Sequence, residues 1–110
     1  LDRDMKYLVV SRRWMDDYRL GERSIIGRSH YEVFPEITER LKEIHRRCLA
    51  GAVEKNDEDP FPRADGSTDW LRWEARPWHQ ADGTVGGIII ILMGILLLTG
   101  KLNLLTAAVV

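Results

Sequence analysis

Residues 65–76 read DGSTDWLRWEAR, a turn signal followed by an alternating segment. It opens with Asp65-Gly66, a pair that is typical of hairpin turns because both residues accept the backbone angles of a tight turn. Apolar and polar side chains then alternate, which predicts a half-buried strand over 68–78. The side chains expected to face the core are Leu71, Trp73 and Ala75, and those expected to face outward are Trp70, Arg72, Glu74 and Arg76.

Further strands are predicted on either side of this one. Asp82-Gly83 marks a second hairpin turn, and the segment 85–92 that follows it contains four consecutive isoleucines. A run that is apolar on both faces is typical of a central strand. Residues 52–59 are predicted to form a polar edge strand, since the nearby Pro60 and Pro62 cannot donate hydrogen bonds to a neighbouring strand.

The N-terminal half is predicted to be helical after an initial strand. Residues 5–10 (MKYLVV) are rich in apolar and β-branched side chains and predict that strand. Ser11 is placed to cap a short helix over 12–18, and two brief helical turns are expected between residues 25 and 34. The most regular helix is predicted over 36–50, where apolar side chains recur at steps of four, three and four: Ile37, Leu41, Ile44 and Cys48. This order of elements predicts an α+β fold.

Composition narrows the functional classes. The chain has 110 residues, with 16 lysines and arginines against 17 aspartates and glutamates, so we expect one domain and no nucleic-acid partner. The single cysteine, Cys48, excludes an internal disulfide and a cysteine-based zinc site. The sequence has no phosphate-binding glycine loop, no HExxH and no GxSxG motif, so neither a catalytic nor a metal site is predicted. The acidic residues Glu54, Asp57, Glu58 and Asp59 are interpreted as a solvated surface.

The C-terminal part of the chain is almost uncharged. Lys101 is the only charged residue after Thr84, and the run 88–110 is long enough to span a bilayer. Two glycines interrupt that run, however, and its first part is already predicted to be a strand. We therefore predict a domain over 1–95 followed by an apolar extension over 96–110. A cytoplasmic location is expected, with membrane attachment through the extension as the alternative.

Several of these motifs resemble the PAS sensor domain family. In the C-terminal half they are Asp65-Gly66-Ser67, Trp70 to Glu74, Arg76-Pro77, and Ala81-Asp82-Gly83 leading to Gly87-Ile88-Ile89-Ile90. In the N-terminal half, Gly21 through Ile26-Gly27-Arg28, followed by Tyr31 to Pro35, resembles the stretch that precedes the long helix of the family. The resemblance covers about residues 1–95.

The resemblance implies both a fold and a function. The fold is an antiparallel sheet of about five strands with helices over one face, enclosing a small cavity, and its first strand lies mostly before Leu1. The function is that of a non-catalytic sensory or regulatory domain in a bacterial signalling protein. Examples are the sensor kinase of a two-component system and a cyclic-dinucleotide enzyme, with an output domain outside this chain. Such a domain binds a small ligand, dimerises, or does both. The alternatives are a ligand-free dimerisation module and a domain anchored to a membrane by its extension.

Two groups of candidate residues follow from these predictions. The long helix and the inner face of the strand 68–78 are expected to form the wall of a ligand cavity: Leu41, Ile44, His45, Cys48, Leu71 and Trp73. Some haem-binding members of the family carry their axial iron ligand at the place of His45, so the resemblance makes haem the cofactor to consider, beside the plainer interpretation of a partly exposed histidine. Aromatic residues beside arginines are typical of protein interfaces. A homodimer is therefore expected to form through Trp70, Trp78, Arg72 and Arg76.

Overall fold

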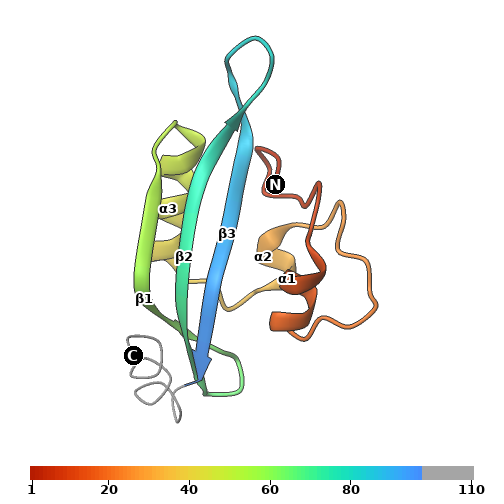
Figure 1. The fold of residues 1–110 in the computed structure, drawn as a ribbon, viewed down its shortest axis with the longest axis vertical. Coiled ribbons are helices and arrows are strands. Elements are labelled where there is room, and N and C mark those ends of the chain that lie inside the picture. Colours follow the sequence, from red (N-terminus) through yellow and green to blue (C-terminus); the bar gives the residue numbers. More distant parts are fainter. Residues whose placement is uncertain (98–110) are drawn as a thin grey trace.

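The computed structural model describes residues 1–97, and it describes side chains as far as residue 94. In this part of the chain three helices precede three strands (Figure 1). The helices are α1 (Arg12–Asp17), α2 (His30–Val33) and α3 (Glu39–Leu49), and the strands are β1 (Glu54–Pro62), β2 (Thr68–His79) and β3 (Val85–Leu97). The fold is therefore α+β, as predicted. Most of the predicted apolar extension, residues 98–110, lies outside the described residues.

The strands form one antiparallel sheet in the order β1-β2-β3, with β2 in the centre. Gly66 and Gly83 lie in the two predicted hairpin turns and have φ angles of 88° and 89°, which glycine adopts without strain. The prediction of about five strands is not matched, because the sheet has three strands over the described residues.

Residues 5–10 do not form the predicted strand and make only isolated bridges to residues 26 and 29. Met5 has a φ of 60°, a left-handed angle that a regular strand does not contain. In addition, the Asp2 carboxylate accepts two backbone hydrogen bonds of 2.9 Å from residues four or fewer positions away. These bonds fold the start of the chain into a turn and override the strand-forming composition.

β3 is longer and more exposed than the sequence predicts. It runs to Leu97 rather than ending near residue 92. Ile88 is fully buried, but the side chains of Ile89 and Ile91 are 45% and 41% exposed. The prediction that this strand is buried on both faces is wrong, because the described residues cover one face of the sheet and leave the other open. Within residues 1–97, no helix is long and apolar enough to cross a membrane.

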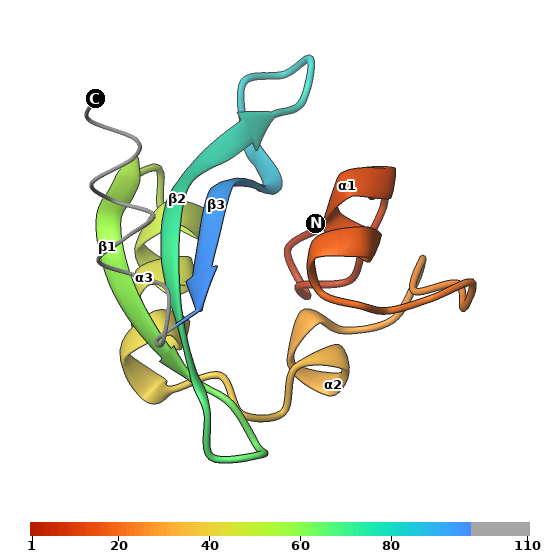
Figure 2. The same ribbon diagram turned by 60° about the horizontal axis from the view of Figure 1, so that its bottom comes forward.

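The helices cover one side of the sheet in two separate parts. α3 lies across the face of the sheet, whereas α1 and α2 lie beyond the edge formed by β3 (Figures 1 and 2). Each helix begins after a hydroxyl side chain that accepts a backbone hydrogen bond: Ser11, as predicted, then Ser29 and Thr38. Because Thr38 is the cap, α3 begins at Glu39 and not at residue 36.

The alternation in β2 positions its side chains as predicted. Leu71, Trp73 and Ala75 are buried, while Arg72 and Arg76 are exposed. α3 packs against both β2 and β3. The buried face of β2 is therefore covered by α3, whereas α1 and α2 lie to the side of β3.

Candidate functional site

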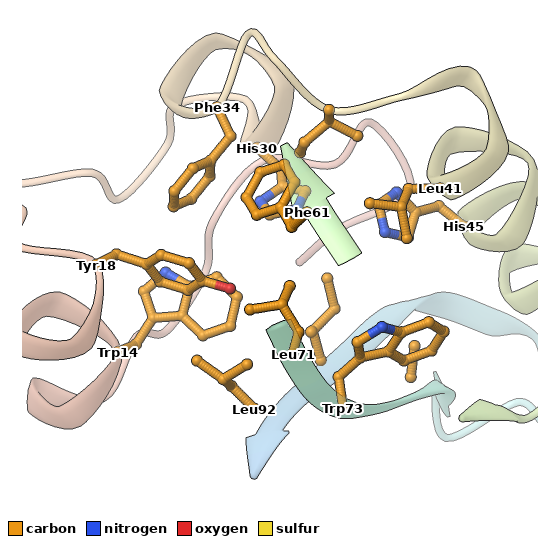
Figure 3. A pocket seen from close by; sticks show the side chains of 13 residues that line it. Trp14, Tyr18, His30, Phe34, Leu41, His45, Phe61, Leu71, Trp73 and Leu92 are labelled. Atoms are coloured by element: carbon orange, nitrogen blue, oxygen red, sulfur yellow. The ribbon is translucent and has the colours of Figure 1, made fainter. Parts of the chain in front are cut away.

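A cavity of about 50 Å³ lies between the inner face of the sheet and the helices (Figure 3). All three helices and all three strands of the described chain contribute side chains to its wall. Most of these side chains are aromatic or aliphatic, and none carries a carboxylate, ammonium or guanidinium group. The aromatic members are Trp14, Tyr18, Phe34, Phe61 and Trp73, and the imidazole members are His30 and His45.

His30, the first residue of α2, is a polar group inside this apolar wall. Its side chain belongs to a residue that is only 6% exposed, and the Tyr7 hydroxyl lies 2.5 Å from its Nδ1 atom. Burial is the main cause that lowers the pKa of His30 to about 3, and His45 and the N-terminal ammonium contribute to the same shift. The His30 ring is therefore uncharged at neutral pH.

His45 on α3 repeats this arrangement. It is also 6% exposed, and its Nδ1 atom lies 2.8 Å from the hydroxyl of Tyr31, whose ring stacks on the imidazole. Burial lowers the pKa of His45 to about 4, with a further contribution from Arg46. The rings of His30 and His45 lie edge to face with their centroids 5.4 Å apart. Two neutral imidazoles thus lie together in the cavity wall.

A buried carboxylate fixes the ring of Trp73 from the side of β1. Asp59 is 1% exposed, accepts a hydrogen bond of 2.8 Å from the Trp73 indole N–H, and pairs with the guanidinium of Arg40. The interpretation of Asp59 as a solvated surface residue is wrong. The register of β1 shifts between Asn56 and Asp59, and such a bulge reverses which side chains point inward. Asp59 and Phe61 are buried as a result.

Arg63, just after β1, covers the aromatic end of the cavity. Its guanidinium pairs with the carboxylates of Asp69 at 2.9 Å and Glu36 at 3.3 Å, so its charge is balanced outside the cavity. The guanidinium also lies over three rings of the cavity wall, which is a favourable arrangement for a cation. The rings are those of Phe61, Phe34 and Tyr18, at 5.0, 5.8 and 5.9 Å from their centroids.

The structure divides the six residues predicted to form a cavity wall into two sets. Leu41, His45, Leu71 and Trp73 line the cavity, whereas Ile44 and Cys48 are buried without lining it. The Cys48 thiol donates to the carbonyl of Ala75 at 3.5 Å, and burial raises its pKa, so it is a protonated, packed side chain. A ligand-binding role for any of the six stays a prediction.

Sequence reasoning missed the contribution of the N-terminal helices. Trp14, Tyr18, His30 and Phe34 all line the cavity, and together they close the side that α3 does not cover. Helices of six and four residues are too short for a periodic pattern to identify an inner face. The aromatic character of these positions was the one signal in the sequence that could have found them.

The cavity does not fit a haem. Pockets for organic ligands of even modest size have volumes of roughly 300 Å³ or more, well above the volume of this cavity. Among the described residues, no group of three or more histidine, cysteine, aspartate or glutamate side chains is placed to hold a metal ion.

The residues predicted to form an interface do not share one exposed surface. Arg72 and Arg76 are exposed, and Trp70 is half-buried. Trp78 packs within the chain: its indole N–H donates to the carbonyl of Leu1 at 2.8 Å, and its ring covers the two glycines at the start of β3. Trp78 is half-buried rather than exposed, and an interface role for all four residues stays a prediction.

Comparison with known proteins identifies one family. The model of the family described as "PAS fold" matches residues 1–95. No curated protein matches the sequence. The matched range contains every residue that lines the cavity.

The burial of Asp59 gives a first prediction. The substitution Asp59→Ala removes the acceptor of the Trp73 indole and the partner of Arg40, so we expect a loss of about 2–4 kcal/mol in the free energy of unfolding. The matched control is Asp57→Ala, because Asp57 is a 78% exposed carboxylate on the same strand and should change stability by less than about 1 kcal/mol. Urea denaturation of both variants measures the difference, and equal losses would contradict the role given to Asp59.

The two buried histidines give a second prediction, on pH. Their pKa values in the folded chain, about 3 and about 4, lie below the ordinary value of 6.5, so the unfolded chain binds protons first. Stability is therefore fully present above pH 6.5 and is lost as the pH falls toward 4, by roughly 1.4 kcal/mol per pH unit for each histidine. Urea denaturation between pH 7 and 5 measures the slope. His30→Leu and His45→Leu should each reduce this slope by the contribution of one proton, roughly 1.4 kcal/mol per pH unit. An unchanged slope in both variants would refute the assignment to the two histidines.

Proposed function

The chain belongs to the PAS fold family, generally a sensory or regulatory module, and from this we propose that it is a non-catalytic sensor domain whose internal cavity holds a small ligand. We further propose that it works inside a larger signalling protein, a sensor kinase or a cyclic-dinucleotide enzyme. In such a protein it would control an output domain.

The observation that carries this proposal is the composition of the cavity wall. Side chains from every described helix and strand meet around one small space (Figure 3). A molecule in that space would contact α1, α2, α3 and the sheet at the same time. It would therefore change how α1 and α2 pack against α3 and the sheet. A ligand that prefers one packing of these parts shifts the population toward it, by no more than its difference in affinity between the two states.

The outer face of the sheet favours a second candidate function, that of a homodimerisation module. Ile89, Ile91 and Met93 occupy alternate positions on β3 and are each more than 40% exposed, so they form an apolar stripe on the uncovered face. On the adjacent strand, Arg72 and Arg76 flank Glu74, so both signs of charge lie beside the stripe. A second copy related by a two-fold axis places this stripe against itself and is the partner that we propose.

Ligand sensing is tested with small molecules and the indole resonances of the purified chain. Wild-type protein is titrated with a panel of uncharged organic molecules of few heavy atoms while the N–H signals of Trp14 and Trp73 are followed by NMR. We expect some members to shift both signals. The control is Ala75→Leu, which adds three carbon atoms at a buried position in the cavity wall and should abolish the shifts. Absence of binding by every member to wild-type protein would contradict a sensing role.

Dimerisation is tested by placing a charge in the apolar stripe. Ile91→Glu should weaken self-association by roughly tenfold or more, because a carboxylate would be desolvated in the interface. The matched control is Val53→Glu, since Val53 is 55% exposed and precedes the sheet. Light scattering over a range of concentrations gives the mass of each variant. A monomeric wild-type protein, or equal association of both variants, would refute the interface.

A further inference from the structure

The polar groups among the lining side chains are the indoles of Trp14 and Trp73, the hydroxyl of Tyr18 and the imidazoles of His30 and His45. Two of these groups are imidazoles. In each, a tyrosine hydroxyl is bonded at Nδ1, which makes Nε2 the other polar atom of the ring. Both rings line the cavity, one from α2 and one from α3 (Figure 3). The indole N–H of Trp73, by contrast, is already bonded to Asp59.

The tyrosines also determine where the proton of each neutral ring lies. Tyr7 is 3% exposed, so its hydroxyl proton needs an acceptor within the protein, and His30 Nδ1 is the acceptor that the described residues provide. A neutral imidazole that accepts at Nδ1 carries its own proton on Nε2. We assign the same tautomer to His45, because the Tyr31 hydroxyl lies 2.8 Å from its Nδ1 atom in the same arrangement. Both rings then present Nε2–H donors.

The cavity wall offers no counterion to a charged molecule, and this excludes an ionic ligand. None of the lining side chains is charged, and the nearest guanidinium over the wall, that of Arg63, is paired with Asp69 and Glu36. An anion or cation in the cavity would lose its hydration without gaining a counterion, which costs several times more than burying a hydrogen-bonded neutral group.

The size of the cavity limits the ligand to a few heavy atoms. One water molecule needs roughly 10–15 Å³ of such space. The volume of about 50 Å³ therefore corresponds to a handful of non-hydrogen atoms, and the aromatic and aliphatic wall favours an apolar body.

We infer that the ligand class of this cavity is a small, uncharged molecule with an apolar body and an oxygen acceptor, received by the Nε2–H groups of His30 and His45. This inference rests on the proposed sensing function and goes beyond it by naming the chemistry that is recognised. Tyr7 and Tyr31 act as positioning residues, because they touch the imidazoles and fix the tautomer that the ligand meets.

Three probes of nearly the same shape test this inference. Acetone has an oxygen acceptor and no charge, and acetate has oxygen acceptors and a negative charge. 2-Methylpropene has neither an acceptor nor a charge. Binding to wild-type protein is measured by titration with NMR detection of the Trp14 and Trp73 indoles. We expect acetone to bind roughly tenfold more tightly than 2-methylpropene, by its hydrogen bond, and acetate to bind weakest of the three.

Two variants separate recognition of the oxygen acceptor from packing of the apolar body in the cavity. The double substitution His30→Leu, His45→Leu should remove the preference for acetone while keeping the affinity for 2-methylpropene, which also shows that the cavity is intact. Tyr7→Phe keeps the imidazoles but releases His30 Nδ1, so it should weaken acetone binding several-fold and leave 2-methylpropene unchanged.

The outcomes distinguish this inference from the proposed function. If none of the probes binds to wild-type protein, both the ligand class and the sensing role are contradicted. If 2-methylpropene binds as tightly as acetone, or acetate binds as tightly as either, the sensing role stands and the assigned ligand class is overturned. Unchanged acetone binding in the double variant also overturns it.

Discussion

The burial of one face of β2 is the constraint on which the rest of the structure depends. Leu71, Trp73 and Ala75 present a continuous apolar surface, and removing this surface from water is the main favourable term available to so small a domain. Two separate parts of the chain cover it: α3 on the face itself, and α1 with α2 from beyond β3 (Figure 2). The cavity lies where these parts meet, and Leu71 forms part of its wall.

Polar groups in and around the core bond to partners that lie 14 to 23 positions away in the sequence. Tyr7 reaches His30, Tyr31 reaches His45, and Asp59 reaches Trp73. Each bond satisfies a group that would otherwise cost stability inside an apolar core. Burial keeps both imidazoles uncharged, and the tyrosine bonds orient them. Stability and the proposed recognition of a neutral ligand therefore depend on the same buried groups.

Long periodic segments made much of this arrangement predictable. The alternation in β2 identified Leu71 and Trp73, and the spacing along the long helix placed Leu41 and His45 on its inner side. The short or irregular segments did not make their part of the arrangement predictable. Asp59 is buried because a bulge shifts the inward positions of β1 by one residue, which no alternation pattern reveals. His30 lies on a helix of four residues, and its partner Tyr7 comes from a segment whose strand-like composition is overridden by a left-handed residue and a carboxylate-bonded turn.

The cavity wall contains two neutral imidazoles, each bonded to a tyrosine hydroxyl at Nδ1, and we propose that this bond fixes the tautomer of each ring. The most direct test is the measurement of ¹⁵N chemical shifts of the His30 and His45 side chains by NMR at neutral pH. The account predicts that both rings are uncharged, with the proton on Nε2 and an unprotonated Nδ1 that accepts from the tyrosine hydroxyl. An imidazolium signal from either ring, or a proton on Nδ1, would contradict it.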